Sequence, residues 1–249
     1  MKTKTSKNFL ITGITGVIGK AIHTYILENI PDAKIFLVSR SNKIKIQENA
    51  SLCHLPNIDL TNETDLHKLK HMVDEFFGNE IFHVINCAGG YVEHTPFEDV
   101  SLSEAKRVIS ENLFTVYGMA HTMVPLMRKR SGGHFIVFGC NSIKYNYPYM
   151  AEFTCSKAAV ASLMKSLASE CSKDGLQFNT FHLVTVKSEK EKECKPRGDH
   201  QNWLEPSDIA DAVISFTQQK NNLHNGGEMQ LMIYSQDYWE RGYFERIKK

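Results

Sequence analysis

Apolar runs of strand length alternate with stretches of helical periodicity along the whole chain. The expected strands are residues 9–12, 34–39, 52–58, 81–86, 134–140, 177–184 and 228–234. Apolar residues recur at helical spacing over 66–76 and 160–167, and a further helix is expected over 206–217, where a proline and an aspartate begin it. This repeated order of strand, helix and strand predicts a parallel sheet with helices on both faces.

The pattern predicts a single α/β domain over residues 1–249, a doubly wound Rossmann-type fold around a seven-stranded parallel sheet. A length of 249 residues, 42% of them hydrophobic, suffices for one sizeable core. The sequence contains no internal repeat and no linker rich in proline, glycine or serine. The densely charged segment 187–200 is expected to be a surface loop.

The charge balance, the hydropathy and the cysteines indicate which partners and cofactors the chain is expected to lack. Lys plus Arg (29) nearly balance Asp plus Glu (28), so no overall field favours nucleic acid or anionic lipid. No apolar stretch approaches the ~20 residues that span a bilayer. The six cysteines lie at scattered spacings without a Cys-x-x-Cys pair, which argues against a metal site and a disulfide framework. We therefore expect a cytoplasmic protein without a metal and without a nucleic-acid or membrane partner.

A glycine-rich loop follows the first expected strand. It reads Thr12-Gly13-Ile14-Thr15-Gly16-Val17-Ile18-Gly19 and precedes a helix. Glycines let the backbone approach a pyrophosphate, and the N-terminal amides of the helix attract its charge. An ordinary strand-to-helix turn is the alternative interpretation, but the position at the first junction of strand and helix favours a dinucleotide site.

Ser39-Arg40 stands at the end of the second expected strand, where a dinucleotide site places the side chain that meets the adenosine ribose. A carboxylate there would bind a free 2′-hydroxyl and repel a 2′-phosphate, whereas an arginine attracts the phosphate. The pair therefore favours NADP(H) over NAD(H). A solvated surface arginine is the alternative interpretation of Arg40.

Further motifs follow in order along the chain. They are Asp59-Leu60, Asn86-Cys87-Ala88-Gly89, Asn112, residues 133–137 and Ser156-Lys157-Ala158-Ala159. In this order they resemble the short-chain dehydrogenase/reductase family over nearly the whole length. The resemblance implies that a nicotinamide dinucleotide is held by Gly13, Thr15, Gly16, Val17, Ile18, Gly19, Ser39, Arg40, Asp59, Leu60, Asn86, Ala88, Gly89, Lys157 and Ser188.

The chain departs from the family at the expected chemistry. Carbonyl reduction in the family uses a tyrosine as general acid, a lysine that lowers its pKa, a serine that orients the substrate oxygen, and an asparagine. The resemblance implies that Asn112, Cys140, Phe153 and Lys157 occupy these positions, with Phe153 in place of the tyrosine and Cys140 in place of the serine. A phenyl ring has no proton to give, and a thiol is a weak donor. Val17 also replaces a glycine of the single-domain branch.

Nearby tyrosines are candidates for a substitute proton donor. Tyr149 lies four residues before Phe153 and is expected in the first turn of the helix, after Pro148. Tyr145 and Tyr147 lie in the preceding loop, where a bend can bring either inward. Aromatic packing beneath the loop is the alternative role for all three.

Three functions stay open on the sequence. The first is an NADP(H)-dependent oxidoreductase that reduces a small carbonyl-type substrate through a non-standard proton relay. The second is a degenerate relative that serves as a dinucleotide-binding, structural or regulatory subunit, and the third is elimination or isomerisation on the same scaffold. Residues 187–205, the variable substrate loop of the family, are rich in charge, which favours a polar substrate or none.

The resemblance also implies that copies of this chain assemble into an oligomer. Relatives dimerise through two long helices, here residues 110–130 and 149–171, so a homodimer or homotetramer is expected. The alanines of the second helix, Ala151, Ala158, Ala159, Ala161 and Ala168, are small enough for close helix approach. The C-terminal tail, residues 235–249, carries an aromatic and apolar set that suits an interface or a packing element.

Overall fold

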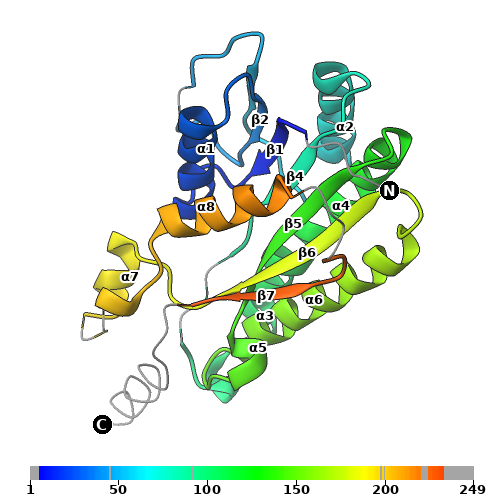
Figure 1. The fold of residues 1–249 in the computed structure, drawn as a ribbon. Coiled ribbons are helices and arrows are strands. Elements are labelled where there is room, and N and C mark those ends of the chain that lie inside the picture. Colours follow the sequence, from blue (N-terminus) through cyan, green and yellow to red (C-terminus); the bar gives the residue numbers. More distant parts are fainter. Residues whose placement is uncertain are drawn as a thin grey trace.

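Seven strands form one sheet in the order β3-β2-β1-β4-β5-β6-β7 (Figure 1). The computed structural model describes residues 6–44, 46–90, 92, 94–196, 198, 200–219 and 224–232. All neighbouring strands are parallel. The strands are β1 (Asn8–Thr12), β2 (Lys34–Val38), β3 (Leu52–Leu55), β4 (His83–Asn86), β5 (Gly133–Cys140), β6 (Leu176–Leu183) and β7 (Glu228–Leu231). The predicted seven-stranded parallel fold is therefore confirmed.

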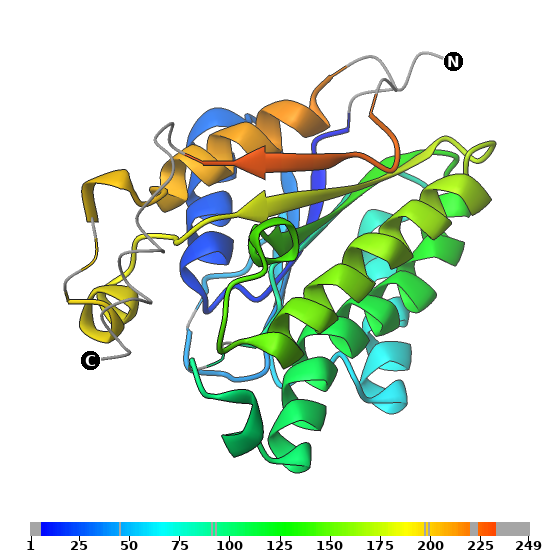
Figure 2. The same ribbon diagram turned by 90° about the horizontal axis from the view of Figure 1, so that it is seen from below.

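Helices cover both faces of the sheet (Figure 2). One face is covered by α1 (Val17–Asn29) and α8 (Pro206–Thr217), which pack on each other. The other face is covered by α2 (Glu63–Phe77), α4 (Thr115–Lys129) and α6 (Ala151–Glu170). Two large apolar clusters, one beneath each layer of helices, form most of the core, and a third, smaller one contains Val92, Val108 and Met150.

Strand β1 shows how the sequence pattern builds these two cores. All five of its residues are buried, because both faces of the sheet are covered. Successive side chains point to opposite faces, so Leu10 joins the cluster beneath α2, α4 and α6, whereas Phe9 and Ile11 join the cluster beneath α1 and α8. A strand buried in this way is nearly continuously apolar, as the sequence is here.

The strand order reverses between β1 and β4. The chain runs outward from β1 through β2 to β3, returns to β4, and then continues in the opposite direction to β7. Such a reversal leaves a crevice at the carboxyl ends of the two central strands. The glycine-rich loop follows β1 and the segment from Cys87 to Gly90 follows β4, so both lie at this crevice.

A long helix begins earlier than the sequence predicts. Its parts are α3 (Leu102–Ile109), η2 (Ser110–Phe114) and α4, which run without a break from residue 102 to 129. The Ser101 side chain caps the start, accepting a hydrogen bond from the Glu104 amide at 3.1 Å. The segment η2 is a π-helical turn, a wider turn often found at functional sites, and it contains Asn112.

Two further expectations about segments need correction. The charged segment 187–200 is not loop throughout, because Ser188 caps a short helix, α7 (Glu189–Cys194), by accepting from the Glu191 amide. Helix α6 begins at Ala151, two residues later than predicted. The remaining short elements are η1 (Phe97–Asp99), α5 (Ser142–Tyr145) and η3 (His200–Asn202). The C-terminal tail and the last residues of the expected strand 228–234 lie outside the described residues.

Candidate active site

Two adjoining cavities lie at the carboxyl edge of the sheet. The first, of about 330 Å³, is lined by Gly13, Thr15, Gly16, Ser39, Arg40, Asp59, Leu60, Ala88 and Gly89 among the residues expected to hold a dinucleotide. The second, of about 380 Å³, is lined by Val17, Ile18, Gly19, Asn112, Cys140, Phe153, Lys157 and Ser188 among the expected site residues. Both share Gly16, Cys87, Ala88 and Gly89, so together they form one continuous groove. Asn86 and Tyr149 line neither cavity.

The glycine-rich loop needs its glycines because it lies against neighbouring backbone. Gly13 has φ +66°, and a β-carbon there would lie 2.6 Å from the carbonyl carbon of Cys87. A β-carbon on Gly19 would lie 2.5 Å from the Gly13 oxygen. Gly16 is the N-cap of α1 and contributes no side-chain cap, so the first amides of the helix are left to another acceptor. This geometry suits a phosphate placed against the loop.

Asn86 is part of the support for this loop. The Thr12 hydroxyl donates to the Asn86 side-chain oxygen at 2.6 Å and accepts from the Ala88 amide at 3.2 Å. Asn86 is almost completely buried. Through Thr12 it ties the end of β1 to the end of β4.

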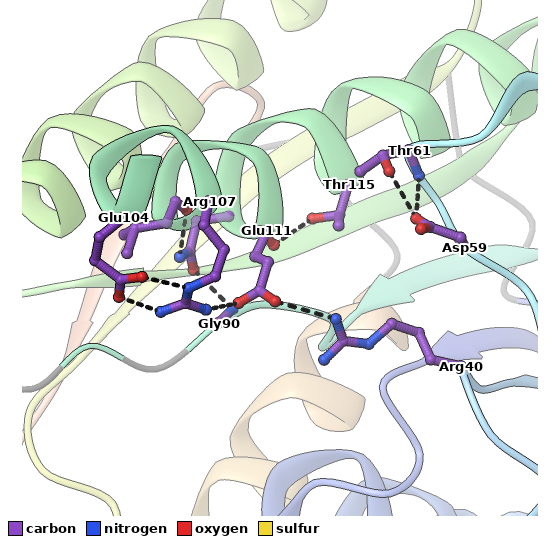
Figure 3. Close-up of polar contacts among 10 residues, drawn as sticks. Arg40, Asp59, Thr61, Gly90, Glu104, Arg107, Glu111 and Thr115 are labelled. Atoms are coloured by element: carbon purple, nitrogen blue, oxygen red, sulfur yellow. Dashed lines mark hydrogen bonds and ion pairs between the residues drawn. The ribbon is translucent and has the colours of Figure 1, made fainter. Parts of the chain in front are cut away.

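The first cavity has a charged outer wall (Figure 3). Arg40 lies just after β2, and its guanidinium donates to the Glu111 carboxylate at 3.2 Å. Asp59 accepts from the Thr61 amide at 2.9 Å and from its hydroxyl at 2.7 Å. These Thr61 hydrogen bonds, aided by the charge of Arg40, hold the pKa of Asp59 below its usual value. The Ser39 hydroxyl donates to the Ser41 carbonyl and lies 2.9 Å from the His54 ring, so it is engaged within the protein.

Asn112 is held rigidly at the junction of the two cavities. Its side-chain amide donates to the Val108 carbonyl at 2.9 Å, and its side-chain oxygen accepts from the Gly90 amide at 3.3 Å. Asn112 is completely buried. A β-carbon on Gly89 would lie 3.1 Å from the Asn112 oxygen and 3.6 Å from the Lys157 amine, so Asn112 and Lys157 both face Gly89.

Lys157 lies on α6 with its amine buried in the second cavity. The amine donates to the Phe138 carbonyl at 3.0 Å and lies 5.4 Å from the centre of the Phe153 ring. Burial lowers the pKa of Lys157 to about 8, and the neighbouring Cys140 opposes part of this shift. The Cys140 sulfur accepts from the Ser142 amide at 3.4 Å. The cavity thus contains an amine that can change protonation state near neutral pH.

Tyr149 is not where the sequence predicts it. It precedes α6 in a left-handed conformation, with φ +65°, and its carbonyl accepts from the Thr95 amide at 2.9 Å. The expectation that it lies in the first helical turn is therefore wrong. Tyr147, which the sequence offered only as an alternative, lines the second cavity and stacks on Tyr145 with ring centres 6.0 Å apart.

The outer part of the second cavity combines apolar and charged walls. Met150, Phe153 and Leu183 contribute apolar surface, and His94 and Lys195 contribute polar surface. Burial, with the charge of Lys195 nearby, lowers the pKa of His94 to about 4. The Lys195 amine lies 3.4 Å from the carboxylate of Glu191 on α7, so this charge is paired within the cavity wall.

Comparison with known proteins agrees with this geometry. The sequence model of the short chain dehydrogenase family matches residues 7–197. The chain belongs to the short-chain dehydrogenase family. An uncharacterized oxidoreductase of Staphylococcus aureus (strain USA300) is 29% identical to this chain over 231 residues, which cover 89% of this chain and 95% of that protein.

Solved structures share the fold. ElxO with NADP bound superposes with a TM-score of 0.79 at 20% identity, over 92% of this protein and 97% of that chain. A tyrosine-to-phenylalanine variant of ElxO with NADPH bound gives a TM-score of 0.80 at 21% identity, over 92% and 97% of the two chains. The 3-ketoacyl-(acyl-carrier-protein) reductase of Brucella melitensis, complexed with NADH, gives 0.78 at 17% identity over 90% and 96%.

Sequence reasoning missed several residues that line the groove. Glu111 and Arg107 line the first cavity, and His94, Glu191 and Lys195 line the second. The sequence could have indicated one of them. Glu111 directly precedes Asn112, a residue that the sequence already placed in the site. Glu191 and Lys195 lie in the segment 187–205 expected to be the substrate loop, but no motif singled out either residue.

The described residues were also searched for metal sites and for membrane-spanning helices. Among them, no group of three or more His, Cys, Asp or Glu side chains is arranged to hold a metal ion. No helix within the described ranges has the length and apolar character needed to cross a membrane. All six cysteines lie in described segments and are free thiols.

Proposed function

We propose that this family member is an NADP(H)-dependent oxidoreductase that reduces a small carbonyl compound in the second cavity. The observation that carries the proposal is the position of the Lys157 amine and the Asn112 side chain, which face Gly89 where the two cavities join. NADP in ElxO and NADH in the Brucella reductase support a nicotinamide cofactor. Arg40 in the first cavity favours the phosphorylated form.

The groove fits a dinucleotide because glycines, which have no side chain, form part of its lining. Side chains at Gly13, Gly19 or Gly89 would fill or distort it. The loop from Gly13 to Gly19 would hold the pyrophosphate at the start of α1, Arg40 and Asp59 would meet the adenosine, and Lys157 would meet the nicotinamide ribose. When bound, the nicotinamide supplies a hydride for the carbonyl carbon.

The carbonyl oxygen also needs a proton as the carbonyl carbon receives hydride. Phe153 has none to give, so another group has to act as general acid. Lys157 meets the requirements, because its amine is buried in the cavity and its pKa is lowered to about 8. In this proposal the Lys157 ammonium donates the proton to the substrate oxygen, and Tyr147 forms part of the cavity wall.

The cavity wall defines the substrate class. Apolar side chains on one side and the paired charges of Glu191 and Lys195 on the other suit a small carbonyl compound with a polar substituent. A cavity of about 380 Å³ is at the small end of the usual range for ligand sites. Small polar ketones and aldehydes are therefore the first compounds to test.

A second candidate function follows from Phe153. A relative without an acidic hydroxyl at this position can bind a dinucleotide and serve as a regulatory subunit with little turnover. The experiment that separates the two candidates has two stages. NADPH and NADH are titrated against the purified protein, and a carbonyl screen with deuterium-labelled NADPH then tests for transfer of the label to product.

The expected result is NADPH binding and transfer of deuterium to a polar ketone or aldehyde. Lys157→Met serves as the matched variant, because it keeps an unbranched side chain out to Cε and removes the amine. Loss of transfer with retained fold, measured by circular dichroism, is expected in this variant. Binding of NADPH without transfer to any carbonyl supports the regulatory candidate, and absence of binding excludes both.

A further inference from the structure

A carboxylate lies in the wall of the first cavity, where Arg40 is expected to meet a 2′-phosphate. Glu111 belongs to the π-helical turn η2 and directly precedes Asn112. Its two carboxylate oxygens have different partners (Figure 3). One accepts from the Arg40 guanidinium at 3.2 Å, and the other accepts from the Arg107 guanidinium at 2.6 Å.

The Glu111 carboxylate is held in place by Arg107 of α3. Arg107 donates to both oxygens of Glu104, at 2.8 and 2.5 Å, and these contacts hold its guanidinium beside Glu111. Gly90 leaves room for Glu111, because a β-carbon there would overlap the carboxylate. The Glu111 side chain is 25% exposed, whereas that of Arg40 is 67% exposed. Arg40 is therefore the partner that can move.

The charges of the first cavity balance. Arg40 and Arg107 contribute the positive charges among its lining residues, and Asp59 and Glu111 contribute the negative ones. Asp59 already accepts two hydrogen bonds from Thr61. Glu111 is the carboxylate that directly contacts Arg40, so removing its charge would leave Arg40 available and the cavity positive.

We propose that Glu111 is a specificity-determining residue, an internal competitor for Arg40 that weakens the preference for a 2′-phosphate. The inference rests on the proposed function, since it concerns the dinucleotide groove. A 2′-phosphate has to displace the Glu111 carboxylate from Arg40 and is repelled by it. A free 2′-hydroxyl meets no such repulsion and can donate to a carboxylate. The chain thus combines a residue that favours NADP(H) with a neighbour that moderates this preference.

The test uses two probes that differ by one phosphate group. Adenosine 2′,5′-bisphosphate carries the 2′-phosphate and adenosine 5′-monophosphate lacks it, and neither reaches the nicotinamide end. Calorimetric titration compares wild type with Glu111→Gln. We expect the bisphosphate to bind about three- to tenfold more tightly to the variant, the scale of an ion pair at a partly exposed site, and the monophosphate to change less than about twofold.

Three further variants test whether tighter binding of the bisphosphate comes from release of Arg40. Glu104→Gln is the matched control, because Glu104 contacts the same Arg107 but does not line the cavity. It should leave the ratio of the two affinities unchanged. Glu111→Gln combined with Arg40→Ala should lose the gain, since the phosphate then has no freed guanidinium to bind. Glu111→Asp keeps a charge for Arg107 but shortens its reach toward Arg40, and should give an intermediate ratio.

Each outcome separates this inference from the proposed function. An unchanged ratio in folded Glu111→Gln overturns the role of Glu111 while leaving the dinucleotide site intact. An altered ratio in a protein that reduces no carbonyl supports the role of Glu111 and counts against the reductase. If neither probe binds wild type or the variants, both proposals fail. Thermal melting of every variant shows whether the fold is retained, and Glu111→Asp replaces Glu111→Gln as the decisive variant if the latter unfolds.

Discussion

The Lys157 amine faces the ring of Phe153, with 5.4 Å between the amine and the ring centre. This distance is within the range of a cation–π contact, which stabilises a buried ammonium by about 0.5–2 kcal/mol. The amine also donates to the Phe138 carbonyl at 3.0 Å. A phenyl ring and one main-chain oxygen compensate only part of the cost of burial, which is consistent with the lowered pKa of Lys157, about 8.

Replacement of Phe153 by tyrosine is expected to increase carbonyl reduction. The new hydroxyl would lie on the ring that faces Lys157, whose ammonium would lower the pKa of the phenol. A positioned general acid contributes about 10²–10⁴-fold, so we expect a gain of at least about tenfold in kcat with small ketones. The measurement is NADPH oxidation under saturating cofactor.

The control for this variant is Phe97→Tyr. Phe97 is an exposed phenylalanine on η1 that lines neither cavity, so the same chemical change should leave kcat unaltered. NADPH binding without any gain in Phe153→Tyr would show that the second cavity does not present a carbonyl to this position. A hydroxyl at position 153 would then play no part in proton transfer, and Lys157→Met would decide whether the protein is a reductase.

The rate of carbonyl reduction is expected to fall as the pH rises through about 8. The reason is that Lys157 donates its proton only as an ammonium, and its pKa is lowered to about 8 by burial. Lys157→Arg should move the fall in kcat to higher pH, because a guanidinium keeps its proton well above this range. Lys165→Arg, an exposed lysine on the same helix, is the matched control. An identical fall near pH 8 in Lys157→Arg would assign it to another group.

The sequence determines much of this fold because its strands are buried on both faces. Such strands are nearly continuous apolar runs, and all seven were found within a few residues of the expected positions. The helix Pro206–Thr217 was predicted with the correct first residue and with an end near Thr217, since a proline starts it and an apolar stripe defines its length. Asn112 and Lys157 were placed by motif, and the fold brings both to Gly89.

The parts that escaped prediction depend on contacts between distant segments or on unusual backbone. The ion pair between Arg40 and Glu111 joins residues 71 positions apart, and no local pattern encodes it. Tyr149 adopts φ +65°, which is rare for a residue with a side chain, so helical spacing misplaced it. The short helix α7 lies in a charged segment without apolar periodicity, and its signal was only the capping serine Ser188.

We expect this protein to form a dimer through α4 and α6. Tyr117 on α4 is 53% exposed, and Phe114 just before this helix is also exposed, so an apolar surface lies on this side. Ala151 and Ala158 are exposed on α6, whereas Ala161 and Ala168 are buried in the fold and are not available to a partner.

Substitution Tyr117→Arg should convert the dimer to a monomer, because it places a charge in a desolvated contact. Light scattering at micromolar concentration measures the change. Leu27→Arg is the matched control, since Leu27 is an exposed apolar residue on α1, away from α4 and α6. A wild-type protein that is already monomeric would contradict the prediction, as would equal dissociation of both variants.

Stability is expected to fall as the pH drops below about 6.5, because two histidines are buried together at the amino end of the sheet. The rings of His83 and His134 lie 5.0 Å apart. Burial, and for His83 also the neighbouring His134, lowers the pKa values from 6.5 to about 3 for His83 and about 4 for His134. The unfolded chain therefore takes up protons first as the pH falls from 6.5 toward 4. Stability is fully present above pH 6.5 and is lost across this window.

The variant His134→Phe isolates one of these two groups. A phenylalanine can pack against Phe216, whose ring centre is 5.6 Å from that of His134, and it removes a ring nitrogen that has no hydrogen-bond partner among the described residues. A single histidine with a fully lowered pKa contributes about 1.4 kcal/mol per pH unit to the fall in stability. Urea denaturation between about pH 7 and pH 5 should therefore show a smaller loss for His134→Phe than for wild type, by roughly 2 kcal/mol. The control is His71→Gln. It removes a surface histidine whose side chain is 81% exposed, so this variant should keep the pH dependence of wild type. Parallel pH profiles for wild type and His134→Phe would show that His134 is protonated equally in the folded and unfolded chains, contrary to its burial.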